Sequence, residues 1–189
     1  MIAIIDYGAG NIFSVKNALD YLGLPAALTA DPEAIRNADA LILPGVGAFP
    51  SAMQMLHDSG LTGVIREESR KKPFLGICLG MQLIFEKGYE FEECDGLGLV
   101  PGKVEKIEAP GMVIPHMGWN KPEESYVYFV HSYQAVVPDE YLAAYVEYGT
   151  AKIPAMVYDG KTVYGAQFHP EKSGEIGLQI LRNFGGLIG

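Results

Sequence analysis

The chain has 189 residues, of which 49% are hydrophobic and 20% charged, and its 14 basic and 23 acidic side chains give a formal net charge of −9. This length predicts one domain with a substantial core, and the composition is that of a globular protein, not of a disordered or fibrous one. An acidic balance argues against nucleic-acid binding, which depends on basic side chains that neutralise phosphates. The sequence contains no apolar run of the roughly 20 residues that a membrane helix needs and no basic leader region, so we expect a cytoplasmic protein that does not bind membranes.

Short apolar runs alternate with segments of helical period in the first half, which predicts an α/β fold with a largely parallel sheet. Strands are expected at 2–5, 40–43 and 74–77. A helix is expected from Ile12 to Leu22, because apolar residues recur at spacings of three and four and Gly23 follows as a stop signal. A second helix is expected over about 51–70.

The second half has a different pattern. Between about 96 and 151, short apolar runs are separated by Gly, Pro and Asp turns, which predicts β-hairpins or a mixed β insertion. The runs at 155–158 and 162–168 predict a hairpin across Asp159-Gly160, a dipeptide favoured in two-residue turns. The chain closes with a helix expected at about 174–184. Because no linker or repeat interrupts it, we expect a single domain over 1–189.

Cys78 lies in Gly76-Ile77-Cys78-Leu79-Gly80, where an expected strand gives way to a helical pattern. Such a turn demands backbone angles and close approaches that glycine tolerates. It exposes the sulfur at the carboxyl edge of the sheet, points a helix N-terminus at it, and leaves the N–H of Leu79 free to hold an oxyanion. A free cysteine is more commonly a small buried hydrophobe, but this context favours a nucleophile.

His169 and Glu171 follow the apolar run at 162–168, two positions apart. In extended chain two such residues point to the same side, so the carboxylate can orient the ring while the other ring nitrogen faces a thiol. The alternative is a surface histidine beside a solvated carboxylate.

His57, His116 and His131 lie in no context that demands proton transfer, and their spacing with Cys94 is not that of a zinc site. Cys94 lies among acidic residues that would raise its pKa and blunt its reactivity.

Several motifs distributed along the chain resemble those of the class I, triad-type glutamine amidotransferases. The elbow G-I-C-L-G-M-Q and the later H-P-E identify that superfamily, and finer motifs resemble its glutaminase subunits from imidazole glycerol phosphate synthases. These finer motifs are D-Y-G-A-G-N from Asp6, L-P-G-V-G-A-F from Leu43, P-H-M-G-W-N from Pro115, F-V-H-S-Y from Phe129 and F-H-P-E-K-S from Phe168.

The resemblance implies a flavodoxin-like α/β domain with a small added β portion and a Cys78-His169-Glu171 triad that hydrolyses glutamine without a cofactor or metal. It implies that the substrate site is formed by Gly45, Val46, Gly47, Leu79, Gln82, Ser132 and Tyr133. The oxyanion would be held near Val46 and by the N–H of Leu79, with a peptide flip in P-G-V-G governed by the partner. On spacing alone, P-G-V-G is simply a tight turn.

The resemblance also implies a partner, a (β/α)₈-barrel cyclase that receives the ammonia and forms a heterodimer with this chain. Asn11, Trp119, Tyr128 and Lys172 would lie at the interface, although Trp119 could equally pack in the core. Alternatives are a glutaminase subunit for pyridoxal phosphate, anthranilate or guanylate synthesis, an interaction module without catalysis, and a free-standing cysteine hydrolase. The acidic segment from Glu90 to Asp95 belongs to no recognised motif.

Overall fold

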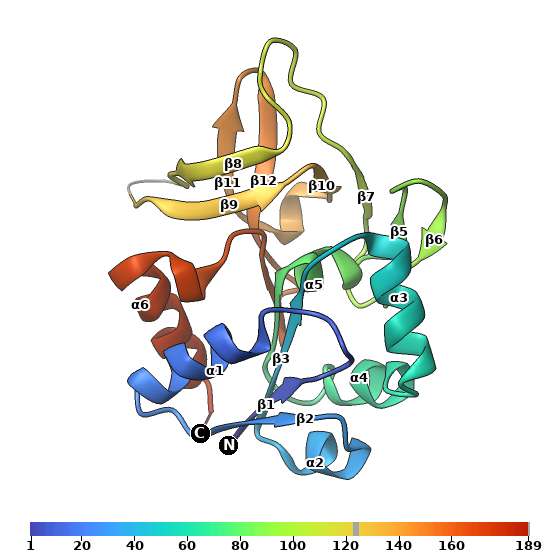
Figure 1. Cartoon of the computed structure of the whole chain (residues 1–189), viewed down its shortest axis with the longest axis vertical. Coiled ribbons are helices and arrows are strands. Elements are labelled where there is room, and N and C mark those ends of the chain that lie inside the picture. Colours follow the sequence, from blue (N-terminus) through green and yellow to red (C-terminus); the bar gives the residue numbers. More distant parts are fainter. Residues whose placement is uncertain (123–124, 189) are drawn as a thin grey trace.

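A computed structural model describes residues 1–122 and 125–188 and has helices on both faces of one large sheet (Figure 1). The sheet has seven strands in the order β11-β12-β13-β4-β3-β1-β2. They are β1 (Ile2–Ile5), β2 (Ala26–Thr29), β3 (Ala40–Gly45), β4 (Phe74–Cys78), β11 (Leu142–Tyr148), β12 (Ala151–Tyr158) and β13 (Val163–Ala166). Every pair from β13 to β2 is parallel, and β11 and β12 add antiparallel pairs at one edge. The predicted α/β fold with a mostly parallel sheet is confirmed.

Both faces of the central strands are buried under helices. The helical elements are α1 (Ile12–Tyr21), α2 (Pro32–Asn37), α3 (Phe49–Asp58), α4 (Thr62–Glu68), α5 (Leu79–Leu83), α6 (Gly174–Gly185) and the 3-10 turns η1 (Asp139–Tyr141) and η2 (Pro170–Lys172). Ile2 and Ile4 share an apolar cluster with α1 and α6, whereas Ala3 and Ile5 share one with α2, α3 and α4. This burial on two sides explains the continuous apolar runs in the sequence. Within the described residues, no helix is long and apolar enough to cross a lipid bilayer.

The predicted β insertion is only partly separate from the large sheet, because its last run forms β11 at the edge of that sheet, and the other short strands form two further sheets. One has the strand order β10-β7-β5-β6, and the other is the antiparallel hairpin β8–β9. Their bounds are β5 (Lys87–Gly88), β6 (Cys94–Asp95), β7 (Lys103–Lys106), β8 (His116–Asn120), β9 (Val127–His131) and β10 (Tyr133–Val136). In Figure 1 the β8–β9 hairpin lies at the upper end of the molecule, and both chain termini lie at the opposite end.

Four local expectations need correction. The helix expected over 51–70 is two helices, α3 and α4, because Gly60 adopts φ +72° and turns the chain between them. Neither β2 nor α2 was expected, although α2 begins with a helix cap in which the N–H of Glu33 donates to Asp31 at 3.0 Å. The β12–β13 hairpin forms as expected, but with a four-residue loop, in which the carboxylate of Asp159 accepts three backbone N–H groups.

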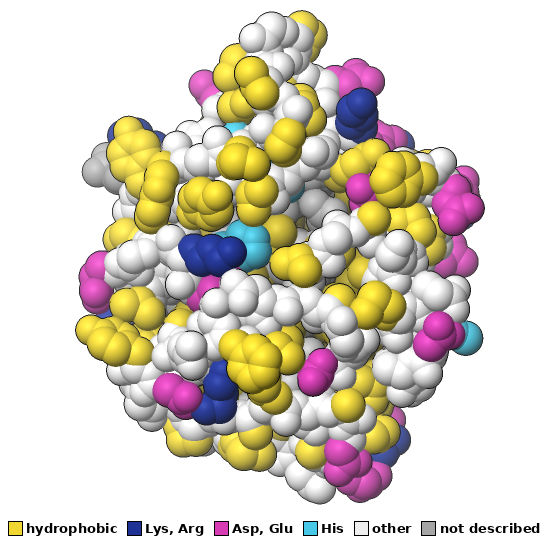
Figure 2. Space-filling model, viewed as in Figure 1, with side chains coloured by type: hydrophobic (Ala, Val, Ile, Leu, Met, Phe, Trp, Pro, Cys, Tyr) yellow, Lys and Arg dark blue, Asp and Glu magenta, His cyan; other side chains and the backbone are white. Residues whose placement is uncertain are grey.

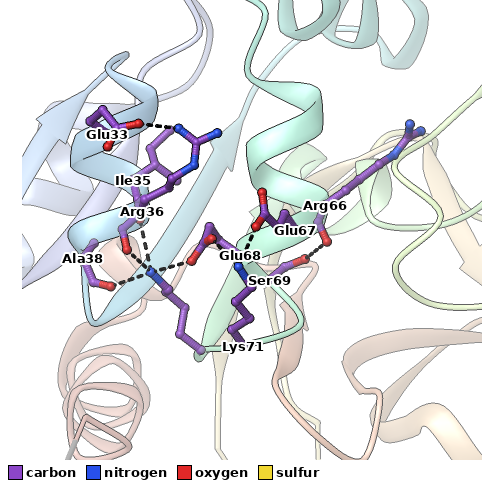
Figure 3. A network of polar contacts seen from close by, with 10 residues as sticks. Glu33, Ile35, Arg36, Ala38, Arg66, Glu67, Glu68, Ser69 and Lys71 are labelled. Carbon is purple, nitrogen blue, oxygen red and sulfur yellow. Dashed lines mark hydrogen bonds and ion pairs between the residues drawn. The ribbon is translucent and has the colours of Figure 1, made fainter.

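A partly buried lysine, Lys72, joins α2 to α4. The ammonium of Lys72 donates to the carbonyls of Arg36 at 2.7 Å and Ala38 at 2.8 Å, and it pairs with the carboxylate of Glu68 at 2.8 Å. Figure 3 shows Ile35, Arg36 and Ala38 at the end of α2, facing Glu68 of α4. Hydrogen bonds from Lys71 and Lys72 lower the pKa of Glu68. A cation at this position satisfies the last carbonyls of α2, which have no partner within the helix.

Candidate active site

Cys78 occupies a sharp turn between β4 and α5, as the sequence predicts. Its backbone has φ 55° and ψ −113°, a combination that L-residues rarely adopt and that costs about 1–3 kcal/mol. A Cβ on Gly80 would lie 1.9 Å from the carbonyl oxygen of Leu43, and one on Gly76 would lie 2.6 Å from the carbonyl oxygen of Gly80. The flanking glycines are therefore required because α5 lies against the backbones of β3 and β4.

His169 and Glu171 form a buried pair beside this turn. The Nδ1 atom of His169 lies 2.8 Å from Oε1 of Glu171, and their side chains are 3% and 1% exposed. The expected extended spacing is wrong, because residues 170–172 form the 3-10 turn η2, which the fixed φ of Pro170 favours. The turn still brings the carboxylate to the ring. The backbone of His169 is held by its N–H, which donates to the carbonyl of Tyr128, and by its carbonyl, which accepts from Ser173.

The electrostatics of His169 favour its charged form. Burial by itself lowers the pKa of this ring, but hydrogen bonds and charge interactions with Cys78 and Glu171 outweigh it and raise the pKa to about 9. Cys78 and Glu171 thus both stabilise the charged form of the ring. The carboxylate oxygen Oε2 of Glu171 is buried without a hydrogen-bond partner among the described residues.

A pocket of about 290 Å³ opens over Cys78 and His169. This is near the lower end of the size range of small-molecule sites and suits a small metabolite. Six of the seven residues expected to bind substrate line it, namely Val46, Gly47, Leu79, Gln82, Ser132 and Tyr133. The seventh, Gly45, is buried beneath it, where an added Cβ would lie 2.6 Å from the backbone nitrogen of Gly80.

In the turn after β3, the backbone of Pro44 is held by a hydrogen bond, whereas Val46 and Gly47 are exposed. The hydroxyl of Tyr7 donates to the carbonyl of Pro44 at 3.1 Å, and burial, together with the nearby Cys78, raises the pKa of Tyr7. By contrast, Val46 is 47% exposed, and Gly47 has φ +101° with no atom within 4 Å of an added Cβ. The exposed side chain of Val46 and the positive φ of Gly47 thus favour a change of backbone conformation at this turn.

Comparison with known proteins agrees with this arrangement. The family model described as "Glutamine amidotransferase class-I" matches residues 3–186. The chain belongs to the class I glutamine amidotransferase family. The predicted resemblance is confirmed, and so is the prediction that the chain is an amidotransferase enzyme.

Among curated relatives of this amidotransferase, the imidazole glycerol phosphate synthase subunit HisH of Bacillus thuringiensis (strain Al Hakam) is 51% identical over 202 residues, which span 100% of this chain and 95% of the relative. The subunit of the same name from Bacillus anthracis is 50% identical over the same extent. Solved structures share the fold at lower identity. A crystal structure of a glutamine amidotransferase matches with a TM-score of 0.77 and 21% identity, covering 98% of this chain and 100% of that one. The structure of PurLQS from Thermotoga maritima matches with a TM-score of 0.72 and 18% identity, covering 97% and 96%.

The pocket of this amidotransferase contains a carboxylate for which no sequence motif predicts a role. Glu90, from the unassigned acidic segment, lines the pocket, and its Oε2 accepts the backbone N–H of Phe49 at 2.7 Å. Phe49 begins α3, so the carboxylate lies at the positive end of that helix. Because 41 residues separate the two partners, no local sequence pattern could have indicated the contact.

Gln82 is buried at the floor of the pocket. Its amide nitrogen donates to the carbonyl of Tyr133 and to Oε1 of Gln167, both at 3.0 Å. Part of its hydrogen-bonding capacity is therefore used within the protein.

The four residues expected at a partner interface lie at or near the surface. Trp119 is 56% exposed and packs edge-on against Tyr128, at 6.0 Å between ring centroids, so it does not pack in the core. Lys172 is exposed, and Asn11 lies partly exposed just before α1. Figure 2 shows hydrophobic side chains gathered over the region of the β8–β9 hairpin, where Met117, Trp119 and Tyr126 are each more than half exposed.

Both cysteines are free thiols, and Cys94 has a pKa raised by burial and by neighbouring Asp95 and Glu92. Across 1–122 and 125–188, no three His, Cys, Asp or Glu side chains are grouped so that they could hold a metal ion. His57 is exposed on α3, whereas His116 and His131 are buried together.

Proposed function

We propose that the chain hydrolyses L-glutamine to glutamate and ammonia through Cys78, His169 and Glu171, as the glutaminase subunit of an imidazole glycerol phosphate synthase in histidine biosynthesis. The observation that carries this proposal is the Nδ1–carboxylate contact of the His169–Glu171 pair, placed beside a thiol that is held on a strained turn at the floor of a pocket. The identity of about 50% with HisH subunits, over the whole chain, supports the choice among amidotransferases.

In the proposed reaction, the thiolate of Cys78 attacks the carboxamide carbon of glutamine while His169 carries a proton. The tetrahedral oxyanion is stabilised by the N–H of Leu79 and by a backbone N–H of the Val46-Gly47 turn. His169 gives its proton to the departing nitrogen, and ammonia leaves a thioester on Cys78. His169 then takes a proton from water, which attacks the thioester carbon to release glutamate and restore the thiolate. Glu171 keeps the ring oriented and stabilises its charge.

Glu90 is suited to hold the α-ammonium group of glutamine. Among the described residues that line the pocket, it is the one carboxylate, and a charge-assisted hydrogen bond of this kind is worth about 1.5–3 kcal/mol. We expect Glu90→Gln to raise KM for glutamine by about tenfold or more with a smaller effect on kcat, because the amide oxygen can still accept the N–H of Phe49. Steady-state assays of glutamate release measure this, with Glu92→Gln as a control in the same segment. An unchanged KM in Glu90→Gln would exclude this role.

The proposed partner is a (β/α)₈-barrel cyclase that forms a heterodimer with this chain and converts the released ammonia, with a ribulosyl nucleotide intermediate, into imidazole glycerol phosphate and aminoimidazole carboxamide ribotide. The exposed apolar side chains of the β8–β9 hairpin support a docking face there, close to the pocket-lining residues of β9. Asn11, Trp119, Tyr128 and Lys172 would contact the barrel. The open Val46-Gly47 turn is suited to the conformational change by which the partner would activate the site.

The test is ammonia or glutamate release by the purified chain, alone and with the cyclase and its nucleotide ligand. We expect weak activity alone and a large increase with the loaded partner. Full activity without a partner would instead indicate a free-standing hydrolase. Activation by a different synthase would identify another amidotransferase subunit, and no activity in any combination would favour an interaction module.

A further inference from the structure

Two buried histidines beside the pocket take no part in the reaction described above. His116 on β8 and His131 on β9 lie directly opposite each other in the hairpin, and they are 3% and 6% exposed. The Nδ1 atom of His116 lies 3.0 Å from the Nε2 atom of His131. The ring of His116 is also stacked on Phe129, at 4.8 Å between centroids, and lies 4.2 Å from the ring of Tyr148.

The neighbours of this pair determine which nitrogens carry protons. The Nδ1 atom of His131 lies 2.8 Å from the carbonyl oxygen of Tyr133, which can only accept, so this nitrogen bears the proton. The Nε2 atom of a neutral His131 is then an acceptor and receives the Nδ1–H of His116. The Nε2 atom of His116 in turn accepts from the amide nitrogen of Asn120 at 3.4 Å. The amide of Asn120 is itself oriented, because its oxygen accepts the N–H of Lys121 at 2.8 Å.

All four groups thus form one directional chain of hydrogen bonds, which is consistent only while both rings are neutral. A second proton on either ring would place two N–H groups opposite each other. Burial supports the neutral state, because it lowers the pKa of both His116 and His131 to about 4, and the nearby charge of His169 acts on His131 in the same direction.

The chain of hydrogen bonds runs from the pocket to the exposed hairpin. At its inner end, the carbonyl of Tyr133 also accepts the amide N–H of Gln82, and Gln82, His131 and Tyr133 all line the pocket. At its outer end, Asn120 follows Trp119 in β8 and also donates to the carbonyl of Glu147 on β11. The wall of the pocket and the face that carries Trp119 are therefore joined by a few polar contacts inside an otherwise apolar cluster.

We propose that His116 is a positioning residue for the glutamine site: through His131 it holds the Tyr133 backbone at the wall of the pocket, and through Asn120 it couples that wall to the β8–β9 hairpin. The proposal rests on the glutaminase function given above. A displacement of the hairpin when the partner docks would then move the wall of the pocket through these hydrogen bonds, while both histidine rings stay neutral.

The test compares two substitutions of His116 in the full-length chain with its cyclase. His116→Asn keeps a side-chain N–H that can replace Nδ1–H toward His131, whereas His116→Phe retains the stacking between Phe129 and Tyr148 but offers no donor. We expect KM for glutamine to rise about tenfold in His116→Phe, with a smaller fall in kcat, and to stay within about threefold of wild type in His116→Asn, because a buried acceptor left without a donor is costly. His57→Asn, on an exposed helix position, is the matched control.

A spectroscopic measurement tests the chain of hydrogen bonds independently of enzymatic activity. In ¹⁵N-histidine-labelled wild-type protein at pH 7, both His116 and His131 are expected as neutral Nδ1–H tautomers in long-range ¹H–¹⁵N spectra. A charged ring, or an Nε2–H tautomer at either residue, would overturn the proposal, as would a KM in folded His116→Phe equal to that of wild type. Because the spectra require no glutamine, a wild-type protein that shows both tautomers but does not hydrolyse glutamine would count against the proposed function and not against the chain of hydrogen bonds.

Discussion

Replacing Cys78 with alanine is expected to abolish glutamine hydrolysis while the fold and the binding of the partner persist. The substitution removes the proposed nucleophile, and loss of a triad member typically lowers kcat by about 10,000-fold or more. The side chain of Cys78 is small, and alanine at the same turn retains the Cβ that the structure already accommodates. Glutamate release, measured with the loaded cyclase, gives the activity, and circular dichroism with a pull-down of the partner gives fold and assembly.

Cys94→Ala is the matched control for this prediction, because Cys94 is the second free thiol of the chain and lies outside the pocket. We expect it to keep activity within about twofold of wild type, as substitutions away from the site usually do. Ammonia release at the normal rate by Cys78→Ala would contradict the proposed triad. Loss of activity in both variants would instead indicate a general effect of removing a thiol.

Gly80→Ala is expected to destabilise the protein by roughly 3 kcal/mol, within the range known for overpacked backbone contacts. The added Cβ would lie 1.9 Å from the carbonyl oxygen of Leu43, so α5 would have to move away from β3. Such a movement would also displace Leu79 and the turn at Cys78. A fall in the urea midpoint of unfolding measures the effect on stability, and glutaminase activity should fall with it.

Gly63→Ala provides the matched control, since it also replaces a helical glycine. An added Cβ at Gly63 has no atom within 4 Å, and the residue lies exposed in α4. Alanine there is expected to stabilise the protein by about 0.5–1 kcal/mol through its helix propensity. If Gly80→Ala were as stable as Gly63→Ala, the close packing of α5 on β3 would not be a requirement of the site.

Local sequence patterns predicted the parts of the protein that depend on neighbouring residues. The parallel strands were visible because burial on both faces demands unbroken apolar runs, as in residues 40–43. The turn at Cys78 could be predicted because glycine is needed at Gly76 and Gly80, where α5 lies against the backbones of β4 and β3. The pairing of His169 with Glu171 was predicted for the wrong local reason, since the chain turns at Pro170, but a spacing of two brings the side chains together in the turn as well.

Short or partly exposed elements were harder to predict. The strand β2 is four residues long and half-buried, and the helix α2 is only six residues long, so neither produces a period long enough to recognise. The expected helix over 51–70 was divided by Gly60, because a residue at φ +72° cannot continue a helix.

Local patterns in the sequence predicted the turn at Cys78, the pairing of His169 with Glu171 and the alternation of strands and helices, because each of these features depends on residues a few positions apart. Contacts between groups that are far apart in the sequence became apparent only in the folded structure. It placed Glu90 at the start of α3, His116 beside His131 across a hairpin, and Trp119 on the surface. Contacts of this kind join residues that are far apart in the chain, and their formation depends on how whole elements pack, for which no local pattern carries a signal.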